Sequence, residues 1–85
     1  MILANYLYEF VTVAKRQNMA QAALDLGLSA SALARHMAAL ESQLQANLLE
    51  RTATGVRLTE DGRYALSVAT KIVEVADGLE ASLRG

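Results

Sequence analysis

The sequence contains no cysteine, no proline and no tryptophan, and only one phenylalanine and three tyrosines among its 85 residues. Without cysteine, neither disulfides nor a cysteine-bound zinc can support the core of so short a chain. One small domain is expected, because this length buries too little surface for two cores. Few aromatic residues disfavour a β-sandwich, whereas the missing proline and the many alanines and leucines favour helices. We therefore expect a mainly α protein that gains further burial from a partner subunit.

Long apolar runs are missing as well. No stretch reaches the roughly 18 apolar residues needed to span a bilayer, and the N-terminus lacks the basic, apolar and small-residue pattern of a secretory signal. We expect a cytoplasmic protein with no membrane partner.

Patterns of catalytic or metal-binding residues are also missing. The single histidine has no cysteine, serine–base arrangement or carboxylate pair placed with it by a recognisable motif, and no glycine-rich phosphate loop is present. The sequence predicts no enzymatic activity, no catalytic residue, no metal site and no cofactor.

The charge is −1 overall but unevenly distributed. Residues 1–58 carry five basic and four acidic side chains, whereas residues 59–85 carry three basic and five acidic ones. Binding to nucleic acid usually calls for a basic surface. If the first segment binds DNA, its net charge of only +1 predicts modest affinity that depends on dimerisation.

Apolar residues recur at helical spacing in three N-terminal segments and predict three helices. The first covers residues 3–16. The second runs from Met19 to Leu26 with Asn18 as its N-cap, and the third runs from Ala30 to about Leu44. The join between the second and third, Gly27–Ser29, is so short that it predicts a helix-turn-helix. The residues expected in the core are Phe10, Leu26, Leu33, Leu40, Leu48 and Leu58.

Two short strand-like pieces, residues 48–51 and 56–58, flank a turn that contains Gly55. They predict a small β-hairpin, or wing. Two strands alone are not stable in water, so this hairpin must pack on the helices.

Thr59 is the expected N-cap of a final helix that runs to about Leu83, a rod about 37 Å long. Its apolar residues step by three and four, as in the heptad seam of a helix that packs on another long helix. Residues 1–58 are too small to cover such a rod, so the seam predicts a homodimer through residues 64–83. The expected interface residues are Ala65, Val68, Ala69, Ile72, Val75, Ala76, Leu79 and Leu83.

Motifs of fixed spacing run through nearly the whole chain without gaps. They are Leu7-x-x-Phe10-x-x-Val13-Ala14, Ala22-Ala23-x-x-Leu26, Ser29-x-x-Ala32-Leu33-x-Arg35-x-Met37-x-x-Leu40-Glu41-x-x-Leu44, Leu48-Leu49-Glu50-Arg51 and Val56-x-Leu58-Thr59-x-x-Gly62. In this order they resemble the N-terminal DNA-binding domain of the bacterial LysR-type transcriptional regulators.

The resemblance implies a winged helix-turn-helix domain over residues 1–58, with the helix-turn-helix at about 19–38 and the wing at about 48–58. Residues 59–85 would be the linker helix that makes the homodimer. The implied function is transcription regulation, in which the dimer binds an inverted-repeat operator in double-stranded DNA. The third helix would enter the major groove, and the wing would lie near the minor groove. A small-molecule effector is implied only if a longer protein carries a C-terminal domain.

The residues that the resemblance places on DNA are Ser29, Ala30, Ser31, Ala34, Arg35, His36, Arg51, Thr52, Thr54 and Arg57. Arg35 is the strongest candidate, because arginine can pair with guanine or with a phosphate. Simpler roles stay open for others: Ser29 as a helix cap, His36 as a surface residue, and Arg57 as the partner of Glu50 across the hairpin.

Several positions depart from the family pattern. The usual Ser-Gln-Pro is Ser29-Ala30-Ser31, a second serine is Ala34, and Thr54 stands where a basic residue is common. A glutamine can reach a base edge with two hydrogen bonds and an alanine cannot. The alternative hypothesis is therefore a helical dimerisation or adaptor module that keeps the fold but binds DNA weakly or not at all.

Overall fold

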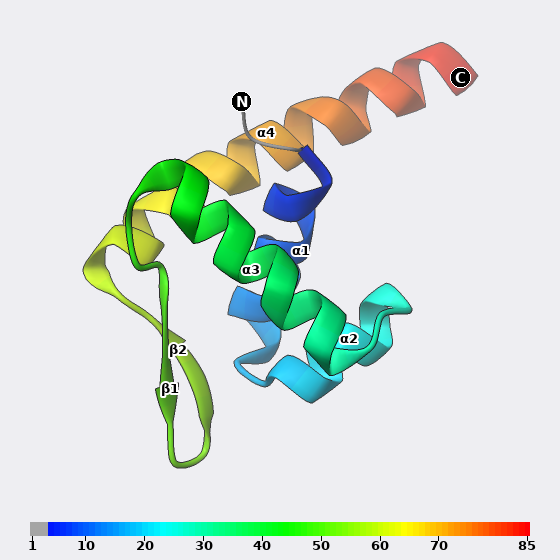
Figure 1. The fold of residues 1–85 in the computed structure, drawn as a ribbon. Helices are drawn as coiled ribbons and strands as arrows, with labels where there is room; N and C mark the ends of the chain where they lie inside the picture. The colour runs from blue at the N-terminus through cyan, green and yellow to red at the C-terminus, as the bar shows by residue number, and fades with distance from the viewer. Residues whose placement is uncertain (1–3) are drawn as a thin grey trace.

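The chain folds into four helices and a two-stranded hairpin (Figure 1). The computed structural model describes residues 4–85. Its elements are α1 (Ala4–Arg16), α2 (Met19–Leu26), α3 (Ala30–Leu44), β1 (Leu49–Thr52), β2 (Gly55–Leu58) and α4 (Glu60–Arg84). The winged helix-turn-helix with a long C-terminal helix is confirmed. The expected start of the first helix at residue 3 lies outside the described residues.

Side-chain caps set the beginnings of three helices. The amide of Gln21 donates to Asn18 Oδ1 at 2.9 Å, that of Ala32 donates to Ser29 Oγ at 3.1 Å, and that of Gly62 donates to Thr59 Oγ1 at 2.9 Å. Each cap satisfies an amide that the first turn of a helix leaves without a partner. The helix boundaries therefore follow from local sequence.

The core lies where α1, α2, α3 and the first half of α4 meet. Phe10, Leu33, Leu40 and Leu48 are fully or almost fully buried, as expected. Leu26 and Leu58, also expected in the core, are half-buried and pack against its edge. Both sit at the end of an element, where fewer neighbours surround a side chain.

The wing is a two-stranded antiparallel sheet that pairs Leu49 with Leu58 and Thr52 with Gly55. One main-chain hydrogen bond joins it to the segment after α1, and another joins its two ends. The amide of Val56 donates to the carbonyl of Gln17 at 3.1 Å, and that of Thr59 donates to the carbonyl of Leu48 at 3.0 Å.

Glu41, at the end of α3, also fixes the wing. Its Oε2 accepts hydrogen bonds from the amides of Leu48 and Leu49 at 2.6 and 3.1 Å. The carboxylate satisfies two amides where the chain enters β1, and this gives a physical role to the Leu40-Glu41 motif. The Glu41 carboxylate thus ties the start of the wing to α3.

The two halves of α4 have different surroundings. The first half packs on α1, whereas the second half extends away from the rest of the chain (Figure 1). The chain as a whole measures 44 Å along its longest axis. Ala69 is 1% exposed, and Ala65 is half-buried against the core. The expectation that Ala69 faces a second subunit needs correction, because its own chain already buries it. Ala65 also lines an apolar groove beside α4, and its place in the interface stays a prediction. No helix in residues 4–85 is long and apolar enough to cross a membrane.

Candidate nucleic-acid interface

The N-terminus of α3 is exposed and rich in hydrogen-bonding groups. Ser29, Ala30 and Ser31 are all solvent-accessible, and the two serine hydroxyls lie 3.2 Å apart. Gly27, in the left-handed region at φ 68°, turns the chain so that α3 leaves α2 at a sharp angle. The helix start offers free amides and a positive dipole end, a combination that favours a phosphate.

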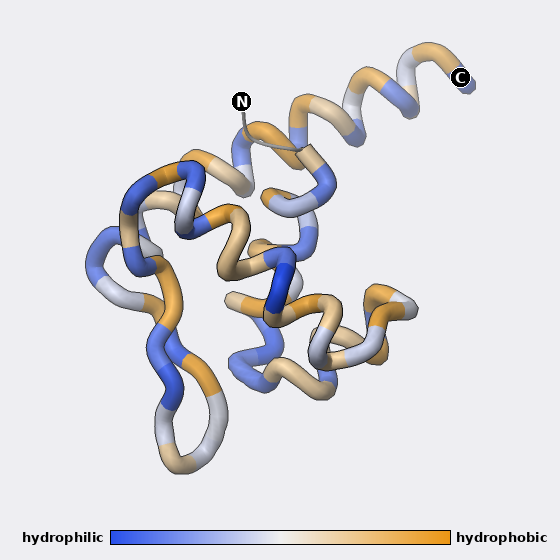
Figure 2. Tube along the Cα trace, in the orientation of Figure 1, coloured by the Kyte–Doolittle hydropathy of each residue, from blue (hydrophilic) through white to orange (hydrophobic). Residues whose placement is uncertain are grey.

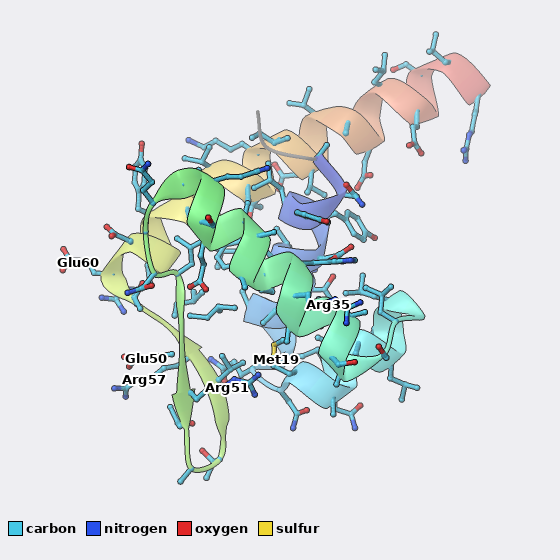
Figure 3. All side chains as sticks on the ribbon, in the orientation of Figure 1. Met19, Arg35, Glu50, Arg51, Arg57 and Glu60 are labelled. Carbon is cyan, nitrogen blue, oxygen red and sulfur yellow. The ribbon has the colours of Figure 1, made fainter. Side chains whose placement is uncertain are left out.

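Arg35 lies one turn beyond Ser31 on the exposed side of α3 (Figure 3). It forms no ion pair with another residue of the described part of the chain. Its guanidinium is thus available for an external acceptor. Ala34, next to it, is half-buried and lines the groove between α3 and the wing.

His36 has a different place from the one expected. Its Nδ1 lies 2.8 Å from Oε1 of Glu9, which is 7% exposed, and its ring stacks on Tyr6 at a centroid distance of 4.6 Å. Both partners belong to α1. The imidazole thus takes part in the packing between α1 and α3, with 26% of the side chain exposed, and its contact with DNA stays a prediction.

The two faces of the wing carry different cations. Arg51 pairs across the hairpin with Val56, which is buried, so Arg51 lies on the face turned toward the helices. Arg57 lies on the other face and forms an ion pair with its cross-strand partner Glu50. Figure 3 shows Arg51 on the side of Met19, with Glu50 and Arg57 on the opposite side.

A groove of about 220 Å³ separates α3 from the wing. Arg51 and Glu50 lie at its wing side, Ala34 and Ala38 at its helix side. Ala38 was not among the expected site residues, although it is exposed and follows Ala34 by one helical turn. That i, i+4 spacing was the signal that could have identified it. Thr52 and Thr54 are exposed toward the tip of the hairpin.

Another cation near the helix-turn-helix is already paired. Arg16, at the end of α1, donates to Asp25 of α2 through Nη2 at 2.9 Å and through Nε at 2.5 Å. Its guanidinium lowers the pKa of Asp25, and the carboxylate raises the pKa of Arg16. Arg35 and Arg51 are thus the cations of the site that form no ion pair within the described residues.

The sequence model described as "Bacterial regulatory helix-turn-helix protein, lysR family" matches residues 4–63. A probable hydrogen peroxide-inducible genes activator of Mycobacterium avium is 40% identical over 79 residues, which are 93% of this chain and 25% of that protein. The HTH-type transcriptional regulator PtxR of Pseudomonas aeruginosa is 38% identical over 94% of this chain and 26% of its own length. The chain thus spans about a quarter of each of these two relatives.

A crystal structure of the CbnR DNA-binding domain with DNA is similar throughout. It has a TM-score of 0.88 and 38% sequence identity, over 96% of this chain and 94% of that one. Its elements therefore match the helix-turn-helix, the wing and the long helix together. Since the family match covers most of the residues and agrees with the fold, this chain belongs to the LysR family of bacterial regulatory helix-turn-helix proteins, which are transcription regulators and not enzymes.

Proposed function

We propose that the chain binds operator DNA as a homodimer and regulates transcription. The observation that carries this is the common exposed surface of the α3 N-terminus and the wing, on which Arg35 and Arg51 have no internal partner. In such a surface α3 enters the major groove, Arg35 reads a base or holds a phosphate, and the wing follows the neighbouring backbone. Ser29 and Ser31 add phosphate contacts at the helix start.

An exposed apolar stripe on α4 supports the dimer. Val75, Leu79 and Leu83 are 73%, 61% and 81% exposed, and the core formed by the described residues does not cover them. The tube in Figure 2 shows apolar segments recurring along this helix. Large apolar side chains left in water in this way mark an interaction surface.

The stripe continues into an apolar groove of about 350 Å³ beside the first half of α4. Leu7 of α1 and Leu44 of α3 form one side, and Tyr64, Val68 and Ile72 form the other. In the proposed dimer the second copy covers both the groove and the free half of α4. Such a dimer places two α3 helices in successive major grooves about 34 Å apart, which requires an inverted repeat.

The remaining parts of the proposal concern the longer regulator. A small-molecule effector would act through a further domain, and the assembled protein would work in the cytoplasm where its operator lies. These follow from family membership rather than from the geometry of residues 4–85.

A salt titration tests the proposal. The protein is added to a labelled duplex from the region upstream of its own gene at several salt concentrations, and its mass is measured in parallel. Binding to DNA should weaken linearly on a log–log scale, with a slope that reflects several phosphates. A stable dimer without salt-dependent binding would instead support the adaptor function that Ala30, Ala34 and Thr54 suggest.

A further inference from the structure

The outer face of the wing carries one acidic and one basic side chain in direct register. Glu50 on β1 and Arg57 on β2 are cross-strand partners, and their side chains form an ion pair. Both are solvent-exposed, with 45% of the Glu50 side chain and 68% of the Arg57 side chain accessible. The pair therefore lies on the surface, where DNA phosphates could compete with the carboxylate.

This arrangement differs from that of Arg51 on the inner face of the same hairpin. Arg51 lines the groove beside α3 together with Glu41 and Glu50, but it forms no ion pair with a carboxylate of the described residues. Arg57 contacts Glu50 through Nε, so a phosphate that binds its remaining N–H groups lies beside the Glu50 carboxylate. Proximity of these two anions is unfavourable.

We propose that Glu50 is an affinity-setting residue: its carboxylate holds the Arg57 guanidinium and repels phosphate at the outer face, so that Arg51 makes the main ionic contact of the wing. The inference rests on the proposed DNA-binding function. Phosphate contacts carry no base information. Glu50 thus weakens binding to every sequence by the same factor and leaves the ratio between operator and unrelated DNA unchanged.

The test compares Glu50→Gln with a matched control, Glu80→Gln. Glu80 pairs with Arg84, 3.7 Å away, near the free end of α4, so the control also removes one charge and releases one arginine. Each variant is titrated against two labelled duplexes of about 30 base pairs, long enough for two half-sites one turn apart. One duplex comes from the upstream region and the other has an unrelated sequence.

For Glu50→Gln we expect about three- to tenfold tighter binding to both duplexes, and a log–log salt slope steeper by about one per subunit. Glu80→Gln should match the wild type within about twofold, because salt screens charges beyond about 10 Å. Equal behaviour of the two variants, while the wild type binds with normal salt dependence, would overturn the inference and leave the proposed function intact. Absence of salt-dependent binding in all three proteins would instead reject the proposed function.

A double variant tests the part played by Arg57. In Glu50→Gln/Arg57→Ala the gain in DNA affinity should be lost, because no guanidinium is left at position 57 to bind the phosphate. If the double variant keeps the full gain, Arg57 is not the group that Glu50 restrains, and the inference fails. Thermal melts should be similar for wild type and Glu50→Gln, since an exposed pair contributes little to stability.

Discussion

The two exposed surfaces of this chain, the α3–wing surface and the free half of α4, are built in opposite ways. The first is assembled from separate elements whose positions are fixed within the chain by Glu41 and by the carbonyls of Gln17 and Leu48. The second is one helix whose apolar side chains contact nothing in the described core. The first surface is thus complete in a single copy, whereas the second leaves large apolar side chains in water that the proposed dimer would cover.

The largest effect is expected where the wing joins α4. A Cβ at Gly62 would overlap the carbonyl oxygen of Leu48, which is backbone and cannot move aside freely. Although alanine normally favours helices, Gly62→Ala should destabilise the chain by about 3 kcal/mol or more. Thermal or urea melts measure this change.

The free half of α4 offers the matched control. Nothing lies within 4 Å of a Cβ built at Gly78, which is exposed. Gly78→Ala should therefore stabilise the chain by about 0.5–1 kcal/mol. If both substitutions changed the free energy of unfolding in the same direction, the contrast between the packed and free halves of α4 would be wrong.

The next effect concerns the uncovered stripe. Leu79→Asp should give a monomer in sedimentation or size-exclusion experiments, because it places a charge in the proposed apolar contact. Affinity for the upstream duplex should fall by about a hundredfold, since two linked half-sites no longer bind together. Ala81→Asp, on the opposite side of α4, is the control and should stay dimeric. A dimer that survives Leu79→Asp would contradict the proposed interface.

A smaller effect is expected on the α3–wing surface. Arg35→Ala should cost about 1–3 kcal/mol of binding and relax base preference if Arg35 reads a base; a uniform loss across sequences would show a phosphate contact. Lys71→Ala removes a cation from α4 and serves as the control in the same titration. Equal losses for the two variants would mean that Arg35 has no specific contact with DNA.

The smallest effect concerns the Arg16–Asp25 pair, which joins α1 to α2 at the protein surface. Arg16 holds the pKa of Asp25 below its ordinary value of 3.8, so the pair stabilises the fold above that pH and this contribution disappears as the pH falls through the lowered pKa. On acidification, thermal melts should show a slightly smaller loss of stability for Asp25→Asn than for the wild type. Identical pH profiles would show that the helix-turn-helix is held by packing and main-chain bonds alone.

Features with local causes could be predicted from the sequence. Asn18, Ser29 and Thr59 are capping residues that precede apolar periodicity, and they begin helices in the structure as expected. The exposure of Arg35 followed from its place on α3. The pairing of Arg57 with Glu50 was one of two open alternatives, because a cross-strand contact depends on the exact register.

Features that depend on distant parts of the chain could not be predicted in this way. His36 contacts Glu9, 27 positions earlier in the sequence, and no local pattern indicates that pair. Ala69 belongs to the same periodic stripe as Leu79, yet Ala69 is buried in the first half of α4, which packs on α1, whereas Leu79 is exposed. Periodicity identifies an apolar face of a helix but not which neighbour covers it.

The hydrogen bond from the Val56 amide to the Gln17 carbonyl also bears on how this protein can evolve. A Cβ at Gly55 would overlap the same carbonyl oxygen, so the anchor requires glycine at this position but no particular side chain at residues 52–54. Residues 52–54 beyond this anchor can therefore be exchanged without moving the backbone of the hairpin. In the proposed complex, substitutions at the tip would change the contacts of the wing with DNA, while the rest of the domain keeps its shape.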